Sequence, residues 1–292
     1  MSIAAAAGIC ESAMRADSDV RRVVGLYCRL QTHVSEVLKR DLAILENEPS
    51  WGLLHSMSER VMEQQAACIS LYSYKYFAPA EALCRTVVEG AVNLYYCSQG
   101  DACKHVLWYF RSYIETERKQ NKQWLASVNS SEHAEELKKS HRDRIQRKDH
   151  ALLGYEQVLT EAFSQIGVSY DKVGKEWPSI FERFKSIGKE VDYRTVYAAL
   201  CSQAHNDAED LINDFVHGVM QIDGAHEAQS DENKNFALYM VLVALTFLIE
   251  ANAIYLAKFN LDALEGFKQL LKDTWQFTGE VTQRKKILQS RS

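Results

Sequence analysis

The sequence has 292 residues, 47% of them hydrophobic, with a formal net charge of -5 and a pI of about 6.0. This acidic balance excludes a protein that coats nucleic acid through an overall basic field. The 7 cysteines include no C-x-x-C pair, which argues against a disulfide framework or a zinc site and predicts reduced thiols in a core.

The first half of the chain predicts long helices, because glycine and proline are sparse and apolar residues recur at helical spacing. We expect helices over residues 19–45, 51–76 and 76–99. The third is apolar nearly all round and should therefore be buried. A fourth helix leads from residue 101 into a mostly charged excursion at 118–150, and residues 18–166 are expected to form one set of helices.

The second half predicts helices within residues 177–276, including an apolar one at 235–259. The ends, 1–17 and 278–292, are expected to be flexible. The most apolar run, 236–249, is too short to span a bilayer, and the N-terminus lacks the pattern of a signal peptide. We therefore expect a single all-α domain spanning residues 1–292, a multi-helix bundle that is cytoplasmic and has no membrane partner.

Several common motifs are absent from the sequence. It contains no G-x-G-x-x-G, P-loop, G-x-S-x-G or H-E-x-x-H motif, and no E-x-x-H pair of the di-iron bundles. We accordingly predict no cofactor and no metal.

One polar stripe interrupts the apolar third helix. Glu81, Arg85, Glu89 and Asn93 recur every four residues and so share one side of the helix. Charges within a core are costly unless they are paired. The stripe is therefore either an internal ion ladder that fixes helix register or the lining of a cleft.

A second polar constellation lies in the helix expected near residues 191–218. Arg194, Tyr197, Ser202 and His205 follow one another there, and an imidazole titrates near neutral pH, as an acid–base catalyst must. His205 is interpreted either as such a catalyst or as a buried histidine that binds a backbone carbonyl or a carboxylate such as Glu89. An aromatic pocket is a further hypothesis, and its residues would be Tyr95, Tyr96, Trp108, Tyr193 and Tyr197.

The charged excursion contains a basic strip that is interrupted by one aspartate. Its residues are Lys138, Lys139, Arg142, Arg144, Arg147 and Lys148. Such clusters bind nucleic-acid phosphates, but a solvated charged helix has the same composition.

These residues carry a resemblance. An R-x-x-x-E helix at Arg85 and Glu89, followed by W-P from Trp177 and Y-R-x-x-Y-x-x-x-x-S-x-x-H from Tyr193 to His205, resembles a bacterial helical family of unknown function. That family is distantly similar to the HEPN superfamily, many of whose members are dimeric, metal-independent ribonucleases of toxin–antitoxin and phage-defence systems. Their active motif is an arginine and a histidine separated by four to six residues. Here ten residues separate Arg194 from His205, whereas Arg144 and His150 meet the spacing.

The resemblance implies an HEPN-like bundle in which the element with Arg85 and Glu89 faces the element with Tyr193, Ser202 and His205. The leading hypothesis is a protein that binds or cleaves RNA, with His205 as acid or base and Arg85 or Arg194 stabilising the transition state. Its expected partners are RNA, an antitoxin or defence subunit, and a second copy of the chain. The alternative is a non-catalytic binding or regulatory subunit with a buried polar network.

Overall fold

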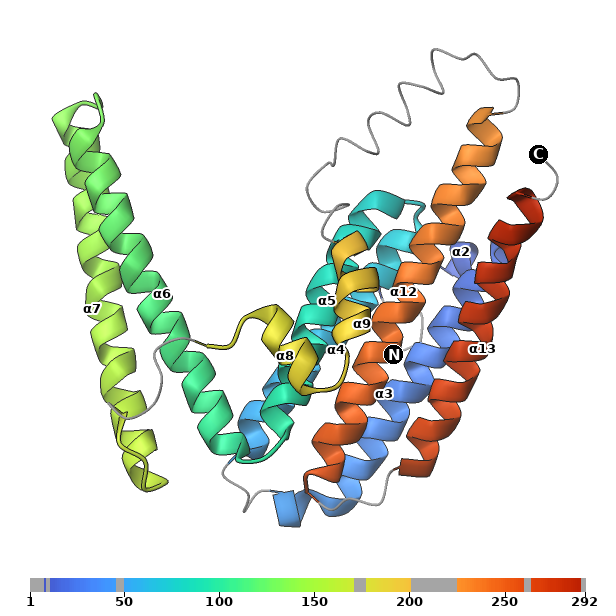
Figure 1. The fold of residues 1–292 in the computed structure, drawn as a ribbon, viewed down its shortest axis with the longest axis horizontal. Helices are drawn as coiled ribbons and strands as arrows, with labels where there is room; N and C mark the ends of the chain where they lie inside the picture. The colour runs from blue at the N-terminus through green and yellow to red at the C-terminus, as the bar shows by residue number, and fades with distance from the viewer. Residues whose placement is uncertain are drawn as a thin grey trace. The chain divides into compact units, whose positions relative to one another are not determined.

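The structure is a computed structural model that describes residues 8, 11–45, 50–170, 177–200, 225–259 and 264–289. Every regular element in these residues is helical, so the protein is an all-α helical bundle (Figure 1). Contacts divide the chain into two compact units. The bundle unit comprises Met1–Gln99 and Ile180–Ser292, and the hairpin unit comprises Gly100–Ser179.

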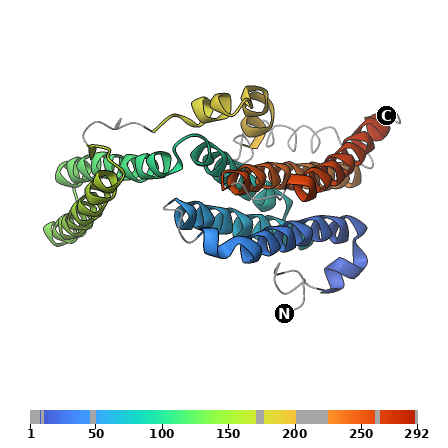
Figure 2. The same cartoon turned by 90° about the horizontal axis from the view of Figure 1, so that it is seen from below.

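In its described residues the bundle unit has five long helices, and the sequence predicts the first three of them to within a few residues. They are α3 (Ser18–Leu45), α4 (Trp51–Ser73), α5 (Phe77–Ser98), α12 (Ala225–Ala257) and α13 (Leu264–Gln289). Figure 2 shows α3 and α4 in one layer and α12 and α13 in another. The predicted central helix α5 packs against both α4 and α12.

The core of the bundle unit lies along α12 because this helix is apolar on nearly every side. Leu238, Leu242, Leu245 and Leu248 are all fully buried. One window within Asp231–Ala257 is long and apolar enough to cross a membrane by length and composition, but 72% of that window is buried inside the protein. A mostly buried core helix of a soluble protein meets the same criteria of length and composition.

The C-terminal end differs from the expected flexible tail at 278–292, because α13 continues to Gln289. Phe277 and Val281, one turn apart, are each only 1% exposed. One turn further on, Arg284 donates hydrogen bonds of 2.7 and 3.0 Å to the two carboxylate oxygens of Asp19 on α3. These contacts extend the helix beyond the predicted end at residue 276. Likewise, a short helix, α2 (Glu11–Ala16), lies within the expected flexible lead.

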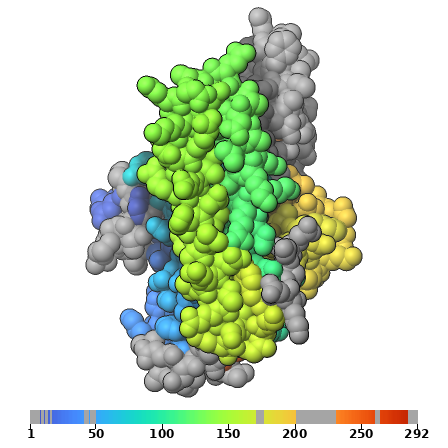
Figure 3. All heavy atoms as spheres, turned by 90° about the vertical axis from the view of Figure 1, so that its left-hand side faces the viewer, coloured from blue at the N-terminus to red at the C-terminus, as the bar shows by residue number. Residues whose placement is uncertain are grey.

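The hairpin unit is built from two long helices. They are α6 (Ala102–Ser130) and α7 (Glu135–Gln165), joined by a turn at 131–134. Figure 3 shows them side by side along their length. Residues 118–150, the expected charged excursion, lie in the second half of α6, the turn and the first half of α7. The hairpin unit itself begins at Gly100.

The second segment of the bundle unit begins with three short helices. They are α8 (Ile180–Ser186), α9 (Glu190–Asp192) and the π-helix η2 (Tyr193–Tyr197). The turn between α8 and α9 contains Gly188, whose φ of 77° favours glycine. These elements place Tyr197 of η2 against α5.

Candidate functional site

The first candidate site is a polar cluster where η2 meets α5, and we call it the α5 cluster, formed by Arg85, Glu89 and Tyr197. Arg85 Nε lies 3.4 Å from Glu89 Oε1, one turn along α5. The Tyr197 hydroxyl, 108 residues away in sequence, donates a hydrogen bond to the same carboxylate oxygen. The guanidinium carbon of Arg85 lies 5.6 Å from the centre of the Tyr197 ring. Two predicted site elements are thus brought together.

Tyr197 is held in this cluster by aromatic packing. Phe184 of α8 is fully buried, and its ring lies 5.5 Å from both Tyr193 and Tyr197 and 5.8 Å from Phe247 of α12. Tyr193 also stacks on Tyr197 at 5.3 Å. Both tyrosines belong to η2, and single-turn π segments are frequent at functional sites.

The α5 cluster is buried on one side and open on the other. Tyr197 is 4% exposed, whereas the side chains of Arg85 and Glu89 are 27% and 37% exposed. A ligand can therefore reach the guanidinium and the carboxylate, and the phenol holds the carboxylate from inside. Such a cluster can bind an anion at Arg85 and accept a proton at Glu89.

The other predicted catalytic residues do not join this cluster within the described part of the chain. Arg194 is exposed, pairs with Glu190 at 3.1 Å and lies 5.1 Å from the ring of Phe181. Ser202 and His205 lie outside the described residues. The predicted approach of His205 to Arg85 therefore stays a prediction.

The remaining members of the polar stripe are buried in different ways. Glu81 is 4% exposed, and the side-chain oxygen of Asn93 is buried and accepts no hydrogen bond from a described residue.

The cysteines near this stripe are core residues. Burial is the main cause that raises the pKa of the Cys84 thiol well above its usual value, and a hydrogen bond with Cys68 adds to it. Burial likewise raises the pKa of Cys97 to about 12. These cysteines are core residues with unreactive thiols, as the sequence predicts.

The residues of the aromatic pocket hypothesised from the sequence belong to both units, so the pocket as a whole stays a prediction. Tyr193 and Tyr197 stack on each other in the bundle unit. Trp108 belongs to the hairpin unit, where its ring lies 5.6 Å from that of Trp177.

The predicted RNA-binding strip lies on α7, and acidic residues neutralise part of it. Lys138 and Arg142 both pair with Glu135, at 3.4 and 3.6 Å, and Lys148 pairs with Glu117 of α6. The remaining members, Lys139, Arg144 and Arg147, have exposed side chains. The exposed positive charge is therefore smaller than the sequence alone indicates.

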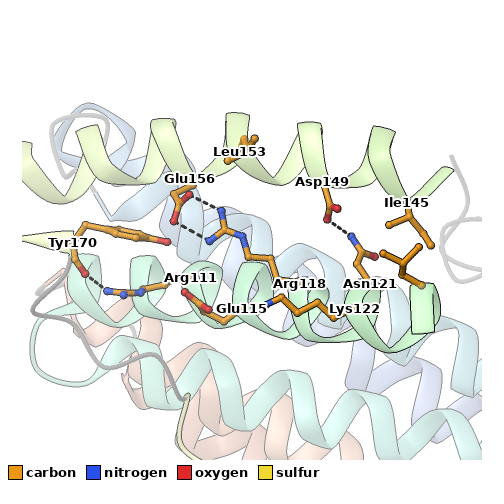
Figure 4. Close-up of a pocket in the computed structure, with 11 residues that line it drawn as sticks. Arg111, Glu115, Arg118, Asn121, Lys122, Ile145, Asp149, Leu153, Glu156 and Tyr170 are labelled. Atoms are coloured by element: carbon orange, nitrogen blue, oxygen red, sulfur yellow. Dashed lines mark hydrogen bonds and ion pairs between the residues drawn. The ribbon is translucent and has the colours of Figure 1, made fainter. Parts of the chain in front are cut away.

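The second candidate site was missed from the sequence. It is a cleft of about 560 Å³ between α6 and α7, which we call the hairpin cleft (Figure 4). Its lining residues are Arg111, Glu115, Arg118, Asn121, Lys122, Leu125, Ile145, Asp149, Leu153, Glu156 and Tyr170. The signal that could have found it is the recurrence of charges at Arg111, Glu115, Arg118 and Lys122, which places them on one face of α6.

Two arginines that line the hairpin cleft are bound by neighbouring groups. Arg118 donates to both carboxylate oxygens of Glu156, at 3.0 and 2.5 Å. This bidentate contact is the main cause that lowers the pKa of Glu156 and raises that of Arg118. Arg111, only 2% exposed, donates to the backbone carbonyl of Tyr170 and lies over its ring.

Metal binding has no geometric support in the part of the chain that the structure describes. Among those residues no group of three His, Cys, Asp or Glu side chains is placed to hold a metal ion.

The fold and the first candidate site define the class of this protein: it is an all-α bundle with a polar cluster at a π-helical turn. Residues 52–221 match the model of a family described as a family of unknown function (DUF5677). The match covers more than half of the chain, so the protein belongs to this family, and the matched range includes both candidate sites. No curated protein and no solved structure matches the chain.

Proposed function

We propose that the protein binds RNA and cleaves it without a metal ion, with the α5 cluster as part of its active site. The observation that carries the proposal is the meeting of Arg85, Glu89 and Tyr197 in a cluster that is open to solvent on the side of its charged groups. The resemblance to the HEPN superfamily supports the same reaction.

The chemistry follows from the groups present. The RNA 2′-hydroxyl attacks the adjacent phosphorus, so that an O2′–P bond forms and the P–O5′ bond breaks. Glu89 accepts the 2′-hydroxyl proton, and Tyr197 holds its carboxylate in place. Arg85 stabilises the charge that develops on the phosphorane oxygens. His205, eight residues beyond Tyr197 in the sequence, is assigned from the sequence as the acid that protonates the leaving 5′-oxygen.

The basic strip on α7 is proposed to bind the RNA backbone through Lys139, Arg144 and Arg147, whose side chains are exposed. Phosphate contacts of this kind add affinity without sequence preference and weaken as salt rises. Substituting all three with glutamine should reduce RNA affinity and its salt dependence, whereas cleavage at saturating RNA should be unchanged.

The experiment is cleavage of labelled RNA in EDTA by the full chain. Glu89→Gln keeps the shape of the side chain but cannot act as a base, and we expect it to lose about 10²–10⁴ in rate. His205→Ala should lose a similar factor. Arg194→Gln is the matched control, because Arg194 is exposed and pairs with Glu190, and it should keep wild-type activity. Wild-type protein without activity above Glu89→Gln would remove the proposal.

The alternative function is a non-catalytic binding or regulatory subunit in which the α5 cluster only stabilises the bundle. The observation that favours it is that one oxygen of Glu89 already accepts hydrogen bonds from both Arg85 and Tyr197. Breaking a fully buried pair costs about 3–5 kcal/mol, whereas a pair as exposed as Arg85–Glu89 should contribute about 1 kcal/mol or less. A large drop in Tm for Glu89→Gln would favour the structural role.

The biological setting is proposed on the same resemblance. A cytoplasmic toxin or phage-defence ribonuclease would act as a dimer and be restrained by an antitoxin or defence subunit. Co-purification with the product of a neighbouring gene, together with light scattering, would test this setting.

A further inference from the structure

We propose that the ion pair between Lys189 and Glu250 positions the α5 cluster for catalysis. The pair anchors η2 on α12 and thereby sets the place where the Tyr197 hydroxyl meets Glu89. For its effect on catalysis the proposal rests on the proposed function, whereas the anchoring of η2 can be tested without RNA. All four residues belong to the bundle unit.

The first observation is a single charge within an apolar helix. Glu250 is the one charged residue between Phe236 and Ala257, a stretch of α12 that otherwise carries apolar and uncharged side chains. Its side chain is only 19% exposed. A carboxylate that is largely removed from water costs free energy unless a cation pairs with it, so Glu250 requires a partner from another element.

The partner comes from the turn between α8 and α9. Lys189 Nζ lies 2.7 Å from Glu250 Oε2 and 4.8 Å from the centre of the Phe247 ring, one turn earlier on α12. The lysine side chain is likewise 19% exposed. Ion pairs that are shielded from water are stronger than exposed ones. The pair therefore ties this turn to one place on α12, beside which α8 and α9 lie in Figure 1.

The chain carries this anchoring from the turn to η2. Lys189 directly precedes α9, and its carbonyl accepts a hydrogen bond of 3.1 Å from the N–H of Tyr193, the first residue of η2. Tyr197 is the last residue of η2, and its hydroxyl donates to Glu89 Oε1. Because every residue between Lys189 and Tyr197 is helical, a displacement of Lys189 moves the phenol.

Aromatic packing alone does not fix the position of η2. The ring of Phe184 contacts the rings of Tyr193, Tyr197 and Phe247. Apolar contacts of this kind are non-directional, so they hold η2 against α12 without defining one position along it. The ion pair joins two defined atoms and supplies that definition.

The consequence for the proposed reaction lies in the orientation of the base. If η2 shifts, the Tyr197 hydroxyl no longer holds the carboxylate of Glu89, which then turns away from the RNA 2′-hydroxyl. Arg85 and the strip on α7, which are proposed to bind phosphates, are unaltered. Loss of the ion pair should therefore lower kcat and leave KM nearly unchanged.

The first experiment is hydrogen exchange of the full chain without RNA. Glu250→Gln removes one charge without leaving a buried carboxylate, and Asp192, 3.6 Å from Lys189 Nζ, still pairs with the lysine, so the fold should persist. We expect the amides of η2 to exchange at least about tenfold faster, with protection in α4 and α5 unchanged. Lys185→Met, which removes an exposed lysine of α8, is the matched control and should exchange like the wild type. Unchanged exchange in η2 of Glu250→Gln would overturn the anchoring.

The second experiment is RNA cleavage by the same variants. Glu250→Gln should lower kcat about 10–10²-fold, whereas Lys185→Met should keep the wild-type value. Adding Tyr197→Phe to Glu250→Gln should lower kcat no further than Tyr197→Phe alone, because both changes act through one hydrogen bond. Exchanging the charges, Lys189→Glu with Glu250→Lys, should restore kcat, a rescue that general damage to the fold would not allow.

The outcomes separate this proposal from the ribonuclease. Losses of kcat that multiply in the variant with both Glu250→Gln and Tyr197→Phe, or a charge exchange that restores nothing, would refute the positioning role. A wild-type protein that cleaves no RNA, together with faster exchange in η2 of Glu250→Gln, would refute the proposed function and retain the anchoring of η2.

Discussion

The two units show two different ways of holding long helices together. In the bundle unit α12 is buried on nearly every side and packs against α5, α4 and α13. In the hairpin unit, α7 has 31 residues but only four of them are buried: Ile145, Leu152, Leu159 and Phe163. Two helices alone cannot enclose a core, so α6 and α7 meet along a narrow apolar seam.

Polar pairs replace the missing core in the middle of the hairpin. Arg118 binds Glu156, Asn121 binds Asp149 and Lys148 pairs with Glu117, each pair joining α6 to α7. The apolar cluster around Leu152, Leu159 and Phe163 lies at one end of the seam. The comparison teaches that this protein places its cleft where two helices are joined by polar side chains rather than by apolar packing.

The largest expected effect comes from the core of the bundle unit. Leu245 is fully buried on α12, and Leu245→Ala should lower the free energy of unfolding by about 2–5 kcal/mol because it leaves a cavity. Hydrogen exchange should show the loss of protection in α4, α5 and α12.

Leu153→Ala is the matched control in the hairpin unit. Leu153 is 51% exposed, so its truncation should change stability by no more than about 0.5 kcal/mol. If Leu245→Ala reduced protection in α6 and α7 as much as in α12, the two units would unfold together, and the contrast between them would be wrong.

Much of the bundle could be predicted from the sequence because its signals are local. Apolar spacing located α3, α4 and α5, and the four-residue recurrence of Arg85 and Glu89 indicated a cluster on one face of α5. The last turns of α13 could not be predicted in this way. Arg284 is stabilised by Asp19, which lies 265 residues away, and a polar tail gives no local sign of that partner.

The hairpin cleft was missed for a related reason. Arg118 and Glu156 lie 38 residues apart, on helices whose charges resemble those of a solvated surface. Only the pairing of α6 with α7 shows which of these charges face each other. The residues of the basic strip could be listed from the sequence. Their partial neutralisation by Glu135 and Glu117 could not, because it depends on side-chain rotamers and on the pairing of α6 with α7.

A smaller effect is expected where α5 approaches α4. A Cβ atom added at Gly90 would lie 2.6 Å from Cγ2 of Val61, and valine is stiff at χ1. Overpacking costs about 1–3 kcal/mol, and the better helix propensity of alanine returns up to about 1 kcal/mol. Gly90→Ala should therefore lower Tm moderately in a thermal melt.

Gly25→Ala provides the comparison for Gly90→Ala. Gly25 lies within α3 and has open space around it, so alanine there should raise stability by up to about 1 kcal/mol. Combining Gly90→Ala with Val61→Ala should recover part of the overpacking cost. If Gly90→Ala were as stable as Gly25→Ala, the close approach of α4 and α5 would be contradicted.

The smallest effect concerns the ion pair that spans the hairpin. The Arg118 hydrogen bond holds the pKa of Glu156 below its usual value, against the opposing effect of burial. Glu156 therefore stabilises the folded hairpin above its unfolded pKa of about 4.3, and this contribution is lost as the pH falls through the lower folded pKa. We expect the pair to contribute about 1 kcal/mol to the free energy of unfolding at neutral pH, because both side chains are about 30% exposed.

The measurement is urea unfolding of α6 and α7 followed by hydrogen exchange at pH 7 and near pH 3. Glu156→Gln should be less stable than the wild type at pH 7 and similar to it at low pH, whereas Glu161→Gln, an exposed change on the same helix, should follow the wild type at both. A constant difference between Glu156→Gln and the wild type across this range would show that the carboxylate charge does not hold the hairpin closed.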